Sequence, residues 1–242
     1  MDAFKKGLVT TADGSLTLRH PLYDEEFHAR EGARFETEQL YIQGSGFFDR
    51  VNDAGVEADC AVLDIGLGLG YNALMTIETW WRSPGRGNLS VHSLEISPEL
   101  VTLLGQIDCV WKEGWSEDWR QWSASLVPIS ADRWKMEANH PASGQRLLWT
   151  VAVGDATAME LGTDRFDFIW QDAFSPRKNP ELWTSAWFAR LKSASRPKAR
   201  LLTYSVARLV KDHLVEAGWS YEKFKAPGGN KKEWLRARLN TI

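Results

Sequence analysis

The fold is decided by the stretch Val62-Leu63-Asp64-Ile65-Gly66-Leu67-Gly68-Leu69-Gly70-Tyr71-Asn72. The apolar run 61–65 predicts a short buried strand, and residues 71–81 carry apolar side chains at helical spacing. A strand, a glycine turn and a helix open a nucleotide-type binding unit. Glycines in such a turn adopt dihedrals that a Cβ forbids, and they let the main chain approach a ligand closely.

The glycine spacing discriminates between two kinds of ligand. A dinucleotide fingerprint reads G-x-G-x-x-G and places a pyrophosphate on the helix N-terminus. Here Gly66, Gly68 and Gly70 alternate, and Tyr71 stands where the last glycine of that fingerprint falls. The shift suits S-adenosylmethionine (SAM), which has no phosphate, and disfavours an NAD-binding dehydrogenase. Because a glycine turn also occurs without a ligand, the SAM prediction depends on other parts of the chain.

Length and composition limit the class of protein. The chain has 242 residues, of which 43% are hydrophobic and 25% charged, which fits one large α/β domain or a domain with an appendage. No signal peptide or apolar run of transmembrane length is evident. Cys60 and Cys109 lie far apart, and the five histidines show no metal-ligand spacing. These features predict a cytoplasmic protein without a metal or a membrane partner.

Charge is distributed unevenly along the chain. From Arg190 onward there are thirteen Lys and Arg against four acids, a local net charge of +9 in a chain whose overall net charge is −3. Such asymmetry marks either a face that binds nucleic acid or a set of solvated side chains on helices. Both interpretations stay open from the sequence.

Strand and helix patterns alternate after the glycine turn. The predicted strands span 89–94, 147–153, 166–170 and 200–204, followed by a hairpin of 219–225 and 233–239 around 227–230. The predicted helices span 156–161, 180–194 and 206–217. This alternation predicts a Rossmann-like doubly wound α/β sheet with a C-terminal antiparallel hairpin.

Two further segments flank or interrupt this unit. Residues 1–58 form an N-terminal extension, with a strand at 16–18 and a helix at 34–42, that either covers the mouth of the ligand site or packs on a sheet edge. The catalytic domain then spans 59–242, with an insertion at about 105–146. The insertion contains five tryptophans, the first four at helical spacing, which predicts a helical cover packed on the domain more than a base-stacking surface. These tryptophans are Trp111, Trp115, Trp119, Trp122 and Trp134.

Four predicted strands end in residues suited to one ligand. In an open α/β sheet, ligands bind outside the carboxyl ends of the strands. The glycine turn would face the amino-acid tail of SAM, Glu95 would accept from the ribose hydroxyls, and Asp155-Ala156 would meet the adenine edge. Asp172 would stand beside the sulfonium methyl group and the substrate. The order predicts a class I SAM-dependent methyltransferase.

The segment Asp172-Ala173-Phe174-Ser175-Pro176-Arg177-Lys178-Asn179-Pro180-Glu181-Leu182-Trp183 resembles the signature D-A-F-[SA]-P-x-K-N-P-x-x-W of the MnmC methyltransferase domain and its stand-alone relatives. Residues 24–27, 36–37, 40–46, Asn72 and 229–233 resemble other blocks of that family, so the likeness covers roughly 15–240. The chain departs from the family at 27–29 and at Ser45, and Asp64 replaces a usual glutamate.

The resemblance implies a reaction, a cofactor and a partner. SAM would methylate 5-aminomethyl-(2-thio)uridine at the tRNA wobble position to 5-methylaminomethyl-(2-thio)uridine, and Glu36 and Asn72 would join the SAM-binding residues. Because the chain ends at Ile242, the FAD-dependent oxidase half of bifunctional MnmC is expected to be absent, and a separate enzyme would supply the aminomethyl group. A methyltransferase acting on a small-molecule amine is the alternative, and a non-catalytic module is a third reading.

Catalysis in such an enzyme should depend mostly on proximity and in-line orientation, because a sulfonium is already a good leaving group. Asp172 is predicted to accept a hydrogen bond from the amine and to orient it. Phe174 and Pro176 would wall the pocket and stack on the extruded uracil. The candidates for phosphate contact are Lys178, Lys231 and Lys232.

Overall fold

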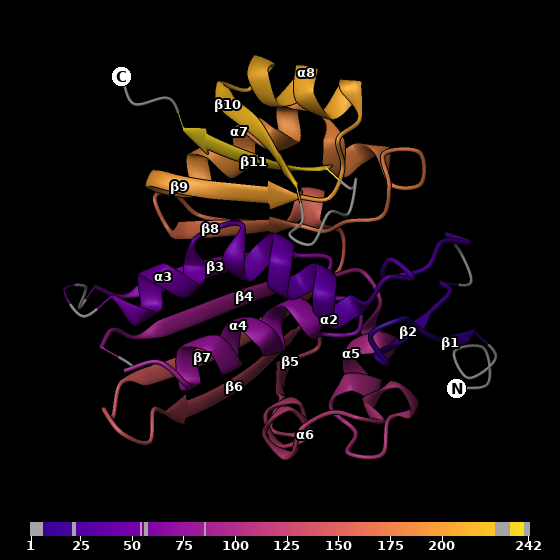
Figure 1. The fold of residues 1–242 in the computed structure, drawn as a ribbon, viewed down its shortest axis with the longest axis vertical. Helices are drawn as coiled ribbons and strands as arrows, with labels where there is room; N and C mark the ends of the chain where they lie inside the picture. Colours follow the sequence, from indigo (N-terminus) through magenta and orange to yellow (C-terminus); the bar gives the residue numbers. More distant parts are fainter. Residues whose placement is uncertain are drawn as a thin grey trace.

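The computed structural model describes residues 7–20, 23–53, 55, 58–84, 86–225 and 233–239. A nine-stranded mixed sheet runs in the order β10-β11-β9-β8-β3-β4-β7-β6-β5, beside a separate two-stranded sheet, β1-β2 (Figure 1). The strands are β1 (Leu8–Thr10), β2 (Leu16–Leu18), β3 (Cys60–Ile65), β4 (Leu89–Glu95), β5 (Val127–Ser130), β6 (Arg133–Asn139), β7 (Arg146–Val153), β8 (Phe166–Gln171), β9 (Ser195–Thr203), β10 (Trp219–Lys225) and β11 (Glu233–Leu239).

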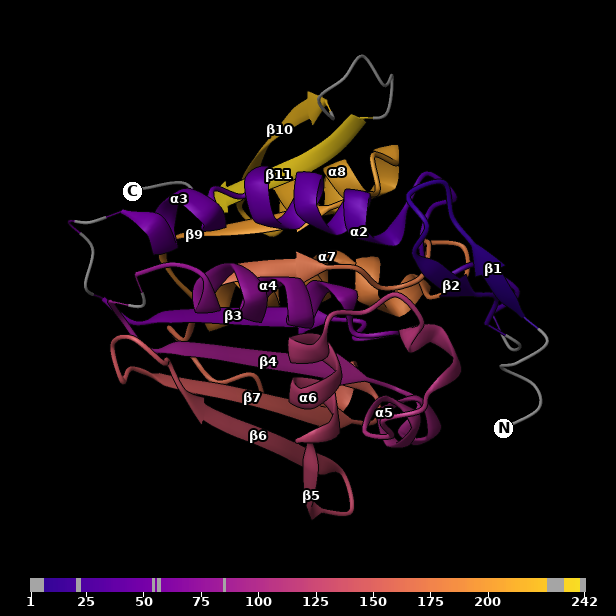
Figure 2. The same ribbon diagram turned by 60° about the horizontal axis from the view of Figure 1, so that its bottom comes forward.

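The helical elements lie on both faces of the large sheet (Figure 2). They are α2 (Ala33–Glu36), the π-helix η1 (Thr37–Gln43), α3 (Phe47–Asn52), α4 (Tyr71–Trp81), α5 (Pro98–Leu104), η2 (Val110–Lys112), α6 (Glu117–Ala124), η3 (Ala156–Ala158), η4 (Pro180–Trp183), α7 (Ser185–Ala194) and α8 (Arg208–Glu216).

The five central strands β7, β4, β3, β8 and β9 pair in parallel, and β10 and β11 add an antiparallel pair at one edge. This confirms the predicted doubly wound sheet and its C-terminal antiparallel strands. The connection between the last two strands lies outside the described residues.

Strand β3 shows how the sequence builds the two layers of the core. All six of its residues are buried, as expected for a parallel strand covered on both faces. Cys60 and Val62 belong to a cluster with residues of η1, α4 and α6, whereas Leu63 and Ile65 belong to a cluster with residues of α7 and α8. The alternation of side chains along one strand therefore divides the helices between the two faces.

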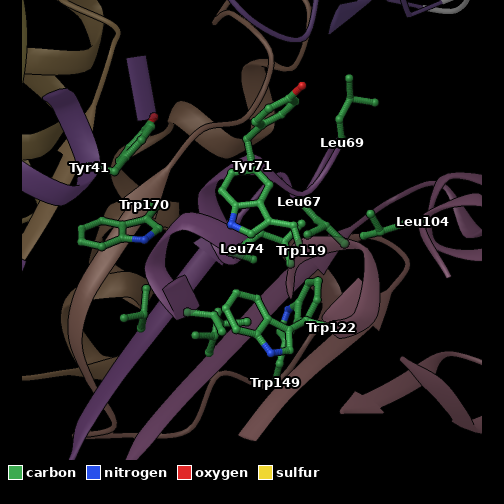
Figure 3. Close-up of a cluster of buried hydrophobic side chains, with 14 of the residues drawn as sticks. Tyr41, Leu67, Leu69, Tyr71, Leu74, Leu104, Trp119, Trp122, Trp149 and Trp170 are labelled. Atoms are coloured by element: carbon green, nitrogen blue, oxygen red, sulfur yellow. The ribbon is translucent and has the colours of Figure 1, made fainter. Parts of the chain in front are cut away.

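The first of these clusters is rich in aromatic side chains (Figure 3). Tyr71 packs edge-on against Trp119 with ring centroids 5.8 Å apart, and its hydroxyl donates to the Leu16 carbonyl over 2.9 Å. Tyr41 packs against Trp170 at 5.6 Å. The N-terminal extension is thus joined to the core of the domain by both packing and hydrogen bonds.

The insertion differs from its prediction in one half. Helix α6 agrees with the expected helical cover, but the prediction is wrong for residues 127–139, which add β5 and β6 to the sheet next to β7. The missed signal is the strict alternation Arg133-Trp134-Lys135-Met136-Glu137-Ala138, which has the period of a half-buried strand.

The tryptophan stripe is core, as predicted, although the residues do not share one helix. Trp111, Trp115, Trp119 and Trp122 are all buried, so they are not a base-stacking surface. Gly114, at φ +77°, lies between Trp111 and Trp115, and the N-cap residue Ser116 separates Trp115 from α6.

Three other predicted helices are shorter or divided. Residues 156–161 form only the single turn η3. The helix predicted at 180–194 breaks at Thr184, whose hydroxyl caps α7 by accepting from the Trp187 amide. The helix predicted at 34–42 continues from α2 into η1, a rare π-helix. Within the described ranges, no helix combines the length and apolar character needed to cross a bilayer.

Asp64 is a buried acid inside β3, and its burial makes stability depend on pH. Ser93 donates to Oδ2 over 2.7 Å, whereas Oδ1 has no hydrogen-bond partner. Burial raises the pKa of Asp64 from 3.8 to about 7. Because the folded state holds this proton more tightly than the unfolded chain, its contribution to stability is full below about pH 4 and is lost as pH rises through about 7.

We therefore expect Asp64→Asn to gain stability relative to the wild type as the pH rises from 5 to 8. Urea unfolding of both proteins across this pH range gives their free energies of unfolding. In the difference between the two values, the contributions of the other titrating groups cancel. A constant difference between the two curves would show that Asp64 is already ionised in the folded protein.

Candidate active site

A cavity of about 550 Å³ lies at the carboxyl ends of β3, β4, β7 and β8. The strand order reverses between β3 and β8, so the cavity occupies the switch point where open α/β sheets bind ligands. Its volume is within the range of small-molecule sites. Residues 23–29 and Glu36 also line the cavity, so part of the N-terminal extension contributes to its wall.

The glycine turn forms the floor between β3 and α4. Gly66 and Gly68 line the cavity and have φ of +85° and +53°, a left-handed region that favours glycine. A Cβ on Gly66 would lie 2.7 Å from the Asp172 carbonyl oxygen. Gly70, at φ +92°, instead begins α4 and faces the Leu104 side chain, and it is not among the described residues that line the cavity.

Glu95 joins the glycine turn to the loop after β4. Its Oε2 accepts from the Gly68 amide and its Oε1 from the Ser97 amide, both over 2.9 Å. The residue is buried, and burial raises the pKa of its carboxyl. Asp155 and Ala156 line the cavity after β7, where the Asp155 carboxylate accepts from the Thr157 amide over 2.8 Å.

Asp172 follows β8 and lines the cavity with both carboxylate oxygens already hydrogen-bonded. The Tyr41 hydroxyl donates to Oδ1 over 2.6 Å, and the Asn72 amide donates to Oδ2 over 2.7 Å. Burial, and next the nearby Glu36, raise the pKa of Asp172 well above its ordinary value. Asn72 is buried behind the cavity wall, so it contacts Asp172 and is not among the described lining residues.

An aromatic group forms one wall of the cavity. Tyr23 stacks on Phe174 with centroids 4.6 Å apart, and Phe27 tilts against it at 5.2 Å. Pro176 lies on the same loop as Phe174 but is not among the described residues that line the cavity. Lys178, on this loop too, is exposed. The two other candidate phosphate contacts, Lys231 and Lys232, lie outside the described residues.

Carboxylates dominate the lining of the cavity. Arg19 is its one arginine or lysine within the described chain, and it pairs with Asp24 at 2.7 Å. His28 adds no charge at neutral pH because burial lowers its pKa to about 4. Such a site favours a cationic ligand. The lining acids are Asp24, Glu25, Glu26, Glu36, Glu95, Asp155, Asp172 and Glu181.

Sequence reasoning gave no individual role to Glu25, Glu181, Tyr41 or Tyr204. The Ser175 hydroxyl donates to Glu25 over 2.7 Å, and the Tyr204 hydroxyl donates to the Ala173 carbonyl over 2.9 Å. Glu25, Glu181 and Tyr41 lie in segments that resemble the family, and this resemblance was the signal that could have identified them. Tyr204 carried none, since it only ends an apolar strand.

Many lysines and arginines of the basic C-terminal segment form ion pairs or hydrogen bonds with other groups of the same chain. Arg196 pairs with Asp167 over 2.7 Å, Lys223 pairs with Glu233 over 2.8 Å, and Arg236 donates to the Gly44 carbonyl over 2.7 Å. These contacts favour a structural role for these cations.

Among all the residues that the structure describes, no cluster of three or more His, Cys, Asp or Glu is arranged to hold a metal ion.

The parallel sheet, the glycine turn after β3 and the acids at the ends of β4, β7 and β8 define a class I SAM-dependent methyltransferase. The chain belongs to that family, because residues 117–240 match the model of the S-adenosyl-L-methionine-dependent methyltransferases. The glycine cradle, which a Cβ would fill, and the acid-lined cavity fit a ligand with a sulfonium and an amino-acid tail.

The chain is similar to tRNA 5-methylaminomethyl-2-thiouridine biosynthesis bifunctional proteins MnmC. It is 31% identical over 229 residues to that of Azoarcus sp., covering 89% of this chain and 33% of the relative. It is 32% identical over 246 residues to that of Aromatoleum aromaticum, covering 97% and 36%. The chain therefore spans about a third of the length of these relatives.

Solved structures share the fold. MnmC2 from Aquifex aeolicus superposes with a TM-score of 0.74 at 26% identity, over 98% of this chain and 71% of that one. Spermidine synthase from Thermotoga maritima superposes with a TM-score of 0.51 at 10% identity, over 96% and 72%, and shows only the common fold.

Gly66→Ala is expected to weaken SAM binding at least tenfold, about 1.4 kcal/mol, because the new Cβ displaces the Asp172 carbonyl. Isothermal titration calorimetry measures the effect. The control is Gly114→Ala, which has a similar φ of +77° and open space around its Cβ position. It should lose about 1–2 kcal/mol of stability with unchanged SAM affinity, and equal affinities in both variants would contradict the assignment.

Proposed function

We propose that this methyltransferase transfers the SAM methyl group to the primary amine of 5-aminomethyl-(2-thio)uridine at the tRNA wobble position, giving 5-methylaminomethyl-(2-thio)uridine. The observation that carries the proposal is the placement of Asp172, hydrogen-bonded and partly buried in an acid-lined cavity beside the glycine turn. Similarity to MnmC along nearly the whole chain supports the choice of substrate. A different active site supplies the aminomethyl group.

The residues divide into two groups around the cavity. The cofactor is held by Gly66, Gly68, Glu95 and the 155–156 turn, together with Glu36, which also lines the cavity. Bound SAM supplies an electrophilic methyl group. Asp172 accepts a hydrogen bond from the amine, which orients the nitrogen lone pair and provides a place for its proton.

The aromatic wall suits a base taken out of its stack. Phe174 lines the cavity, and the Trp183 indole donates to its carbonyl over 2.8 Å, which fixes the start of the 174–179 loop. Phe174 provides a stacking face for the uracil, and Pro176 stiffens the loop that carries it.

The methyltransferase domain in this proposal spans residues 59–242, and residues 1–58 form an N-terminal extension that contributes side chains to its active site.

The 174–179 loop also carries the side chains that we assign to RNA contact. Arg177 and Lys178 are both exposed and, within the described chain, neither forms an ion pair. They stand between Phe174 and Asn179, which both line the cavity. Cations at this place contact phosphates next to the extruded nucleotide.

A small-molecule amine is the second candidate substrate. The observation that favours it is the internal pairing of much of the basic C-terminal segment, which leaves fewer cations for RNA. The acid-lined cavity suits either amine.

Purified protein, SAM and tRNA carrying 5-aminomethyluridine should yield a single methyl gain at the wobble uridine, read by mass spectrometry of digested nucleosides. Asp172→Ala should lower this rate by about 10²–10⁴ while SAM binding persists. Unmodified tRNA and a panel of small amines are the matched substrates. Transfer to a small amine but to neither tRNA would select the second candidate.

Arg177→Ala and Lys178→Ala should each weaken tRNA binding and flatten its dependence on salt, with the slope of log K against log salt reduced by about 0.7–0.9 per phosphate contact. Fluorescence anisotropy across a salt series measures it. Lys192→Ala is the control, because Lys192 is exposed near the end of α7, beside the amino end of β8 and away from the cavity. Equal slopes of log K against log salt for all three variants would show that RNA does not bind at the loop that carries Arg177 and Lys178.

A further inference from the structure

We propose that Thr37, Tyr41 and Asn72 are positioning residues that hold the Asp172 carboxylate toward the cavity, so that the π-helix of the N-terminal extension completes the catalytic site. The proposal rests on the function proposed above and assigns its extension a specific task.

The contacts form one continuous chain. Tyr41 donates to Oδ1 of Asp172 over 2.6 Å, and Asn72 donates to Oδ2 over 2.7 Å. The Thr37 hydroxyl donates to Oδ1 of Asn72 over 2.7 Å. The carbonyl end of the Asn72 amide is thereby occupied, so its NH₂ end faces the carboxylate. Two donors on opposite oxygens prevent rotation of the carboxylate and leave lone pairs for an amine.

The π-helix places both hydroxyls on the same side. Thr37 and Tyr41 belong to η1, a kind of helix that is rare and frequent at functional sites. Its end is anchored twice: the Ser45 hydroxyl donates to the Tyr41 carbonyl over 2.5 Å, and Arg236 of β11 donates to the Gly44 carbonyl over 2.7 Å. The Tyr41 ring packs on Trp170 of β8. Tyr41 is therefore held against the strand that ends in Asp172.

The same donors oppose the effect of burial. The titratable groups around Asp172 are Glu36 on α2, Tyr41 on η1, Asp64 on β3 and Tyr204 after β9. Burial, Glu36 and Asp64 raise the pKa of Asp172, whereas the bonds from Tyr41 and Asn72 lower it. Burial and the Asp172 charge raise the pKa of Tyr41, so its hydroxyl keeps the proton that it donates. Without these donors the carboxyl stays neutral to a higher pH and loses its fixed direction.

The test compares Tyr41→Phe and Thr37→Val with the wild type in two measurements. Carbon-13 NMR follows the titration of the Asp172 carboxyl, assigned with Asp172→Asn, and needs no substrate. Single-turnover methyl transfer to the modified tRNA is followed against pH. In both variants the Asp172 midpoint and the acidic limb of the rate profile should move to a pH about one unit higher, with SAM affinity retained. Thr37→Ser should restore the wild-type values.

Tyr71→Phe is the matched control. It removes another buried hydroxyl that ties the extension to α4, through Leu16, but does not touch Asp172. It should lower the melting temperature and leave both midpoints unchanged. Folded Tyr41→Phe with wild-type midpoints would overturn the proposal, and if that variant does not fold, Thr37→Val decides in the same way. If the wild type leaves tRNA unmethylated, the proposed function fails, while the NMR titration still decides the positioning role.

Discussion

The Asp172 amide donates to the Ile65 carbonyl over 3.0 Å, and the Asp172 carbonyl occupies the space that a Cβ on Gly66 would need. This contact between the ends of β3 and β8 sets the geometry of the whole site. It exists because strand order reverses between these two strands, so the loops after them turn away to opposite sides and leave a crevice. The cofactor loop and the proposed catalytic acid are therefore neighbours through their backbones, before any side chain is considered.

Around that contact the protein buries several acids and pairs few of them with cations. Each oxygen of Glu95 meets a backbone amide, and each oxygen of Asp172 meets a neutral donor. Neutral donors offset part of the desolvation cost without cancelling the negative charge. The cavity thus keeps an unneutralised field that suits a sulfonium and an amine. Burial raises the pKa values of both carboxyls, whereas these hydrogen bonds lower them.

The N-terminal extension belongs to the site in two ways. Residues 23–29 form the outer wall, where Tyr23 and Phe27 pack on Phe174. Helix η1 reaches from behind the wall to Asp172. An element outside the parallel sheet therefore both lines the cavity and donates a hydrogen bond to its central carboxylate, which distinguishes this site from one built only of strand-end loops.

The sequence by itself determined the sheet, the glycine turn and the acids at the ends of β4, β7 and β8, because strand periodicity and strand-end chemistry are local properties of the chain. It also indicated that the tryptophans are core. Only the tertiary structure decided that Asn72 bonds to Asp172, that Tyr41 reaches the same carboxylate, and that many C-terminal cations are paired internally. These are contacts between residues as many as 192 positions apart, which no local pattern encodes. Strand β6 is the exception, since its alternation was readable but the tryptophan spacing suggested a helix.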